Sequence, residues 1–241
     1  MTLEHDHSAA AIAARLSRGP RVSYLRDWIY GGIDGAVTTF AIVAGSLGAS
    51  LSARVILILG AANLIADGFS MAAANYSGTK AEHDDHARLK AVEERHIACA
   101  PEGEREEIRQ IYKAKGYDGD DLESLTNLVV SRRSVWIETM LAEEYGVSAG
   151  LRHPLKSAAA TFSAFVICGL VPLLPFIAGL QASALTAALA TGAVFFAIGS
   201  AKSIWSTQSW FRSGLETLTI GLGAALLAWG VGYVLERLVT L

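Results

Sequence analysis

Five apolar runs, each close to the roughly 20 residues that a helix needs to cross a hydrocarbon core, limit what this chain can fold into. A soluble domain carries roughly a quarter charged residues, whereas only 18% of this chain is charged and 52% is hydrophobic. We therefore predict an all-α membrane protein with five transmembrane helices. The runs lie at about 28–51, 55–76, 157–180, 182–201 and 213–235.

Between the second and third runs the composition changes abruptly. Of the 23 acidic residues, 16 lie within 82–144, and 12 of the 20 lysines and arginines lie within 80–156. Turn residues punctuate this block, and no strand pattern occurs in it, so we predict helices at 81–96 and 103–115 and one or two more over 118–145. The chain then divides into a polar N-terminal segment (1–27), spans one and two (28–79), a helical insert (80–152) and spans three to five (153–241).

The basic residues predict which side of the membrane the insert faces. Four arginines precede the first span, twelve basic residues lie in the insert, and Lys202 and Arg212 join spans four and five. The opposite side receives only Arg54 and Arg237. Because cytoplasmic loops carry the excess of Lys and Arg, we expect a cytosolic insert. No secretory signal pattern is visible, which favours a prokaryotic cytoplasmic membrane, or a vacuolar one if the source is eukaryotic.

Local patterns give five smaller expectations. Pro172 and Pro175 should bend or end the third span. Gly31 and Gly35 form a GxxxG, a spacing that lets another helix approach closely. Glu216, near the start of the last span, should be interfacial. The His5-Asp6-His7 triplet should be a solvated, mobile terminus, and the isolated Cys99 and Cys168 predict neither a disulfide framework nor a zinc motif.

The second span carries a line of polar residues, each four positions from the next, which a helix places on one face: Asn63, Asp67, Met71 and Asn75. The first span contains Asp34. An ionisable residue inside a span is costly and indicates a functional site by default. If Asp34 and Asp67 share a cavity, a proton and a metal dication compete for one carboxylate, as an antiporter requires. The Met71 thioether favours a late first-row metal over calcium or magnesium. The alternative is a structural polar pair that joins two helices.

The insert supplies a second group of candidate ligands. Each of three residue pairs falls on one helical face: Glu93 with His96, Glu104 with Glu107, and Met140 with Glu144. Together they would form a cluster of oxygen, nitrogen and sulfur ligands. The alternative is a set of solvated helices whose acids pair with Arg95, Arg105 and Arg109. A Glu-x-x-His element also occurs in di-iron bundles, but such bundles need two, so a ferroxidase is disfavoured.

These motifs resemble the vacuolar iron transporter family. The resemblance covers roughly residues 24–237 and includes the order of two spans, a charged helical insert and three spans. The wording that carries it is Asp34-Gly35, Thr38-Thr39-Phe40, Val43-Ala44-Gly45, Asn63-Leu64, the run DGFSMAA at 67–73, and in the insert ERH at 94–96, EREEIRQIY at 104–112 and TMLAEE at 139–144.

The resemblance implies a homodimer of five-span subunits that exchanges cytosolic ferrous iron, often manganese too, for protons, without nucleic acid and without an enzymatic reaction. Asp34 and Met71 match its pathway residues. The insert would bind Zn²⁺ or other dications through residues that match family ligands: Glu104, Glu107, Met140 and Glu144, with Glu93 and His96 where the family has two more.

Three positions depart from the family pattern. Asn63 and Asn75 stand where many members carry a glutamate, and His96 stands where a glutamate is expected. We expect Asp67, one turn from Asn63, to take over part of the lost carboxylate role. A different class of function stays open: a membrane-anchored metal sensor or storage-delivery protein whose spans only anchor it.

Overall fold

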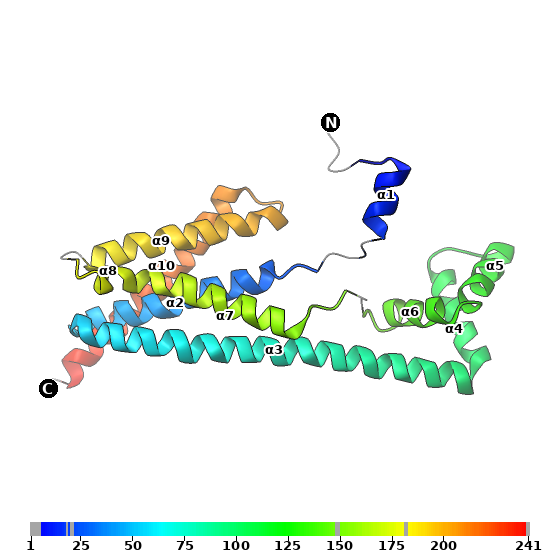
Figure 1. Ribbon diagram of the computed structural model, residues 1–241, viewed down its shortest axis with the longest axis horizontal. Coiled ribbons are helices and arrows are strands. Elements are labelled where there is room, and N and C mark those ends of the chain that lie inside the picture. The colour runs from blue at the N-terminus through cyan, green and yellow to red at the C-terminus, as the bar shows by residue number, and fades with distance from the viewer. Residues whose placement is uncertain (1–5, 18, 20–21, 148–149, 181–182, 240–241) are drawn as a thin grey trace. The chain divides into compact units, whose positions relative to one another are not determined.

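The computed structural model of the chain describes residues 6–17, 19, 22–147, 150–180 and 183–239. Over these residues the chain forms helices and no strand, as the sequence predicts (Figure 1). The elements are α1 (Ala9–Leu16), α2 (Leu25–Gly48), α3 (Ala53–Cys99), α4 (Pro101–Ala114), α5 (Gly119–Val130), α6 (Arg133–Glu143), α7 (Pro154–Leu170), η1 (Val171–Leu173), α8 (Leu174–Ile177), α9 (Ser183–Lys202), η2 (Ser203–Trp205) and α10 (Trp210–Val239).

These helices form two compact units. The membrane unit comprises Ser23–Ser77 and His153–Leu241, and the insert unit comprises Gly78–Arg152 with the described part of Met1–Val22. Each unit has its own apolar core.

The prediction of five spans is confirmed. Five helical stretches are long and apolar enough to cross a membrane: α2, the first part of α3, Pro154–Ile177, α9 and α10. The third stretch is interrupted at the predicted prolines, because α7 ends at Leu170 and a 3₁₀ turn containing Pro172 follows. Proline removes a backbone donor and clashes with the preceding turn, which accounts for the break.

The separate helices predicted at 55–76 and 81–96 are instead one. α3 runs for 47 residues from Ala53 to Cys99 without a break, so the expected gap between span two and the insert is wrong. The only breaking signal in the gap is Gly78. A single glycine costs a helix about 1 kcal/mol, which is too little to end a long one.

The N-terminal segment also contains a helix that the sequence reading missed. In α1 the side chain of Ser8 caps the first turn by accepting a hydrogen bond from the Ala11 amide at 3.3 Å. Asp6 and His7 are exposed, and His5 lies outside the described residues. Cys99 is exposed and Cys168 buried, and both are free thiols.

Glycines bring the backbones of α2 and α7 into contact. A Cβ atom at Gly31 would lie 2.3 Å from the carbonyl oxygen of Thr161, and one at Gly35 would lie 2.3 Å from that of Phe165. The predicted GxxxG therefore admits a neighbouring helix, which is α7. Hydrogen at these positions is what allows two membrane helices to approach so closely.

Glycines also bring the backbones of other spans of the membrane unit into close contact. A Cβ atom at Gly232 of α10 would lie 2.0 Å from the Gly45 carbonyl of α2, and one at Gly199 of α9 would lie 2.5 Å from the Ser213 carbonyl of α10. Phe165 and Phe195 are fully buried between these contacts. Small residues set the helix spacing, and large apolar ones fill the space that remains.

The insert unit is a smaller helical assembly with an ordinary apolar core. The second part of α3 contributes Leu89 and Ile97, and α4 contributes Ile108, which is fully buried. The short helix α6 supplies most of the rest: Trp136, Ile137, Met140 and Leu141.

We predict that Gly35→Ala destabilises the protein, because its methyl group would overlap the α7 backbone, and overpacking of this kind costs about 1–3 kcal/mol. Thermal unfolding in detergent measures the effect. Gly223→Ala is the matched control, since a Cβ there meets no atom within 4 Å. Equal unfolding temperatures for the two variants would contradict the close α2–α7 contact.

Candidate functional site

A sharp corner between α3 and α4 builds the first candidate site. α3 ends at Cys99, Ala100 alone connects the two helices, and Pro101 begins α4. Proline is well suited to the first turn of a helix, where its missing N–H costs nothing. The corner brings the first turn of α4, which carries Glu104, back against the last turns of α3, which carry Glu93 and His96.

These three side chains form a cluster. The ligand atoms of Glu93, His96 and Glu104 all lie within 4.8 Å of one another. His96 Nδ1 is 3.3 Å from Glu104 Oε1 and 3.8 Å from Glu93 Oε1. Glu93 is 0% exposed and Glu104 5%, while His96 is exposed. The structure thus brings together three of the predicted insert ligands, from two helices.

The buried carboxylates are only partly satisfied. The Tyr145 hydroxyl donates a hydrogen bond of 2.9 Å to Glu93 Oε1. Neither Glu93 Oε2 nor Glu104 Oε2 meets a hydrogen-bond donor among the described residues. An unpaired buried acceptor is costly, and a cation between the two oxygens would remove that cost. A mixed set of oxygen and imidazole ligands suits a first-row transition dication.

The other predicted ligands lie differently. Glu107 and Glu144 are exposed, but their charges act on the cluster and on each other. Met140 is fully buried in the insert core, beside residues such as Ile108 and Ile137. Glu107 and Glu144 thus lie at the exposed edge of the cluster, and their role as metal ligands stays a prediction.

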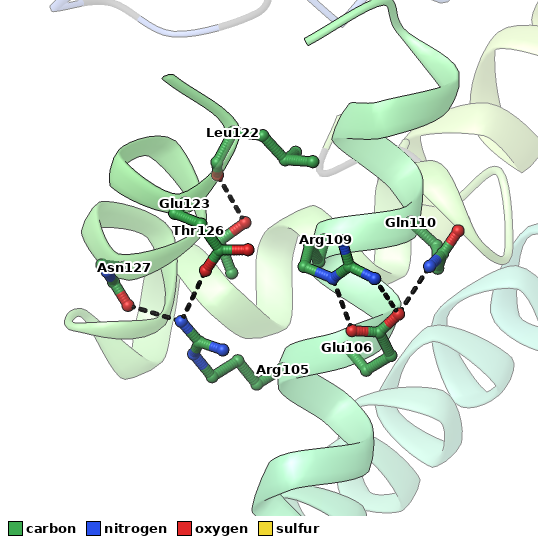
Figure 2. A network of polar contacts seen from close by, with 8 residues as sticks. All are labelled: Arg105, Glu106, Arg109, Gln110, Leu122, Glu123, Thr126 and Asn127. Carbon is green, nitrogen blue, oxygen red and sulfur yellow. Dashed lines mark hydrogen bonds and ion pairs between the residues drawn. The ribbon is translucent and has the colours of Figure 1, made fainter. Parts of the chain in front are cut away.

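Two of the arginines that the alternative reading would pair with these acids, Arg105 and Arg109, bind other residues (Figure 2). Arg105 donates to Glu123 at 3.2 Å and to Asn127 at 2.9 Å, while Arg109 binds Glu106 through two nitrogens at 2.6 and 2.7 Å. This pairing lowers the pKa of Glu106 to about 2. The surface network and the acidic cluster are thus separate sets of residues.

Burial and the mutual repulsion of the acids together keep protons on the cluster. Burial, followed by the charges of Glu107 and Glu93, raises the pKa of Glu104 to about 7. Partial burial and the same neighbouring acids raise the pKa of Glu144, and burial beside Glu93 raises the pKa of the Tyr145 phenol. A carboxylate that holds its proton near neutral pH is one for which a proton and a dication compete.

The second candidate site lies between α2 and α3 in the membrane unit. Asp34 on α2 and Asp67 on α3 are near enough for their charges to repel. Thr38 donates a hydrogen bond of 2.8 Å to the Asp34 carbonyl, and the Asn63 amide donates one of 3.3 Å to the Thr38 hydroxyl. Asp34, Asn63 and Asp67 are all half-buried. Two neighbouring carboxylates beside an amide and a hydroxyl can bind a cation or hold a proton.

The remaining two members of the α3 line have different surroundings. Met71 is half-buried and packs against the apolar core of the membrane unit. Asn75 lies where three helices meet. Its amide nitrogen donates to Asp27 Oδ1 at 2.9 Å, to Thr161 Oγ1 at 2.6 Å and to the Ser157 carbonyl at 3.4 Å.

Sequence reasoning missed several of these residues. Asp27 was assigned to the polar N-terminal segment, yet it belongs to α2 and is 2% exposed. Its spacing of seven from Asp34, two helical turns, was the signal that could have found it. Tyr145, directly after Glu144, gave no such signal, because its contact with Glu93 joins positions far apart in the chain.

The pKa of Glu104 predicts that the metal-free insert loses stability as the pH rises. Because the folded pKa of about 7 exceeds the usual 4.5, the folded state holds the extra proton between these values. Stability therefore falls across this window, by at most about 1.4 kcal/mol per pH unit, and levels off above it. Hydrogen-exchange protection of α4 amides in chelator-treated protein, corrected for intrinsic rates, measures the slope. Glu104→Gln should flatten it and the exposed Glu123→Gln should not; a slope unchanged in Glu104→Gln would contradict the assignment.

The chain as a whole is similar in sequence to proteins of one known family. The model of the VIT family matches residues 25–233. A vacuolar iron transporter of Toxoplasma gondii is 34% identical over 90% of this chain and 76% of its own length. Vacuolar iron transporter 1 of Arabidopsis thaliana is 30% identical over 88% of this chain and 86% of its own length. Vacuolar iron transporter 1 of Eucalyptus grandis is 30% identical over 86% of this chain and 84% of its own length. The family consists of transporters and not of enzymes, and this chain, matched over both its spans and its insert, belongs to the VIT family.

Proposed function

We propose that this protein carries ferrous iron, and manganese as a second substrate, out of the cytosol in exchange for protons. Its relatives are named as iron transporters, which supports metal-ion transport. The observation that carries the finer proposal is the pair of neighbouring carboxylates, Asp34 on α2 and Asp67 on α3. A protein whose spans served only as an anchor would have no use for two repelling acids in its membrane unit.

The exchange follows from competition for these carboxylates. With both ionised, their repulsion favours a dication between them; with metal released, a proton relieves the same repulsion. The Asn63–Thr38 hydrogen bond holds an amide and a hydroxyl beside Asp34, and these oxygens are available as further ligands. Met71, one turn beyond Asp67, would add a soft ligand that distinguishes iron and manganese from calcium and magnesium.

We assign the insert the role of collecting dications on the cytosolic side. Its side is supported by the distribution of basic residues. Glu93, His96 and Glu104 would bind the ion, and Glu107 and Glu144 would add negative charge at the exposed edge of the cluster. Met140 would join them only if its buried side chain changed rotamer. Fe²⁺, Mn²⁺ and Zn²⁺ all suit oxygen and imidazole ligands.

Two further features complete the proposal. The resemblance in sequence implies a homodimer, which light scattering of the purified protein would report as twice the 25.5 kDa chain mass, after subtraction of detergent. The location in a prokaryotic cytoplasmic membrane stays a prediction from the sequence.

For the insert, we predict that Glu93→Gln/Glu104→Gln weakens dication binding to the full chain by at least about tenfold, because even residues that only support metal ligands contribute that much. Titration calorimetry with Mn²⁺ and Zn²⁺ measures the change. Glu106→Gln/Glu123→Gln is the matched control, since it removes the same charge from arginine-paired residues of the same unit (Figure 2). An equal loss of affinity in both variants would mean that the net charge of the insert, and not the cluster, determines dication binding.

For the membrane site, we predict that Asp34→Asn abolishes metal uptake driven by a pH gradient in proteoliposomes. The substitution keeps the size and hydrogen bonding of the side chain but removes the charge that protons and metal share. Met71→Ala should slow iron and manganese while proton binding survives. Glu236→Gln, which removes an acid near the end of α10, should leave uptake at the wild-type rate.

The same assay separates the two classes of function. A sensor or storage-delivery protein would bind dications in calorimetry yet give no uptake in any wild-type vesicle. A folded Asp34→Asn protein that moved metal at the wild-type rate would exclude the proposed exchange site. Asp67→Asn tests whether that acid replaces the glutamate expected at position 63.

A further inference from the structure

The membrane unit contains a cavity that the proposed transport site does not use. It has a volume of about 520 Å³ and lies between the first turns of α2 and the end of α9 with η2. Two cationic side chains line it, Arg26 and Lys202. A cavity lined by two positive charges repels a dication, so it is no part of a metal path.

The rest of the lining is apolar with hydroxyl groups at its margin. Leu25, Ile29 and Tyr30 supply the apolar wall, and Ser23 and Ser206 the hydroxyls. The Arg26 guanidinium lies over the Tyr30 ring, 5.5 Å from its centroid. A soluble anion would leave this apolar wall in contact with water, whereas an amphiphile with an anionic head would cover it.

Neighbouring residues mark this end of the spans as the membrane–water interface. Phe196, Trp210 and Phe211 pack edge to face, with ring centroids 5.8–5.9 Å apart, and Trp210 and Phe211 remain more than half exposed. Exposed aromatic clusters of this kind sit at the level of lipid headgroups. The cavity opens beside the same connection, 203–209, that joins α9 to α10.

The acids nearest to Arg26 and Lys202 do not neutralise the positive charge of the cavity. Glu216 pairs with Lys202 at 3.6 Å, but it lines a separate hollow with Arg212 and is half-exposed. Asp27 adjoins Arg26 in sequence, yet it is buried and faces Asn75. Arg26 is exposed and free of any described acidic partner.

We propose that this cavity binds an anionic phospholipid, with the phosphate between Arg26 and Lys202 and the glycerol and upper acyl chain along Leu25, Ile29 and Tyr30. Basic side chains at a membrane surface attract anionic lipids by about 1 kcal/mol each. A lipid bound here joins the start of α2 to the end of α9 and supports the helix that carries Asp34.

Native mass spectrometry of the full chain in detergent, titrated with phosphatidylglycerol, tests the proposal. Arg26→Gln/Lys202→Gln should weaken binding about thirtyfold, the product of two contacts of that size. Arg54→Gln/Arg212→Gln, which removes two exposed arginines of the same unit, should bind as the wild type does. Glu216→Gln should bind more tightly, because Lys202 loses its competing acid.

Two further ligands identify what the site recognises. Phosphatidylcholine, whose head has no net charge, should bind at least tenfold more weakly than phosphatidylglycerol, and glycerol 3-phosphate, which has no acyl chain, should not compete. Undiminished phosphatidylglycerol binding by the double variant, with unchanged gel-filtration elution, would overturn the proposal. If that variant fails to fold, Arg26→Gln alone tests the proposal, because Arg26 makes no ion pair with a described acid. Its loss should still weaken phosphatidylglycerol binding about fivefold.

Discussion

The membrane unit depends on the close contact between α2 and α7. At Gly31 and Gly35 no side chain separates the two backbones, so α2 has one possible face toward α7. The adjacent face, with Asp34 and Thr38, is then the one that meets Asn63 and Asp67 of α3. The arrangement of these polar side chains therefore follows from glycines that make none of their hydrogen bonds. This explains why a span that carries an acid is also rich in small residues.

The insert differs from the membrane unit in what surrounds its candidate site. Close helix packing positions the polar residues of the membrane unit, whereas like-charged side chains repel one another in the insert. Its arginines are engaged at the surface, and the cluster of Glu93, Glu104 and their neighbours keeps its mutual repulsion. Such a cluster is least stable when ionised and empty. A metal ion bound there, as proposed, would stabilise the insert itself, because a ligand that binds only the folded state favours folding. The Tyr145 hydrogen bond orients one oxygen of Glu93 and leaves the other for an ion.

The sequence predicted the parts of this structure that depend on composition and short spacing. Five spans, the break at Pro172 and the close approach at Gly31 and Gly35 follow from hydropathy, backbone chemistry and side-chain size. The grouping of Glu93, His96 and Glu104 was expected from i,i+3 spacing together with the family resemblance. Contacts such as Tyr145 with Glu93, or Asp27 with Asn75, depend on tertiary geometry that no local pattern encodes. The continuity of α3 was missed because a charged composition was taken for a boundary, although nothing between Tyr76 and Ala81 ends a helix.

Asn75 has a consequence for how the spans respond to acidity. Its amide nitrogen donates to acceptors on α2 and α7 at once. The family resemblance leads one to expect a glutamate here, and a glutamate side chain donates a hydrogen bond only while protonated. Its hydrogen bonds to the neighbouring helices would therefore form in acid and break in base. An amide has no proton to lose over the physiological range. In this protein the donor at the junction of the three helices is therefore independent of pH, although one of its acceptors, Asp27, is itself a carboxyl group.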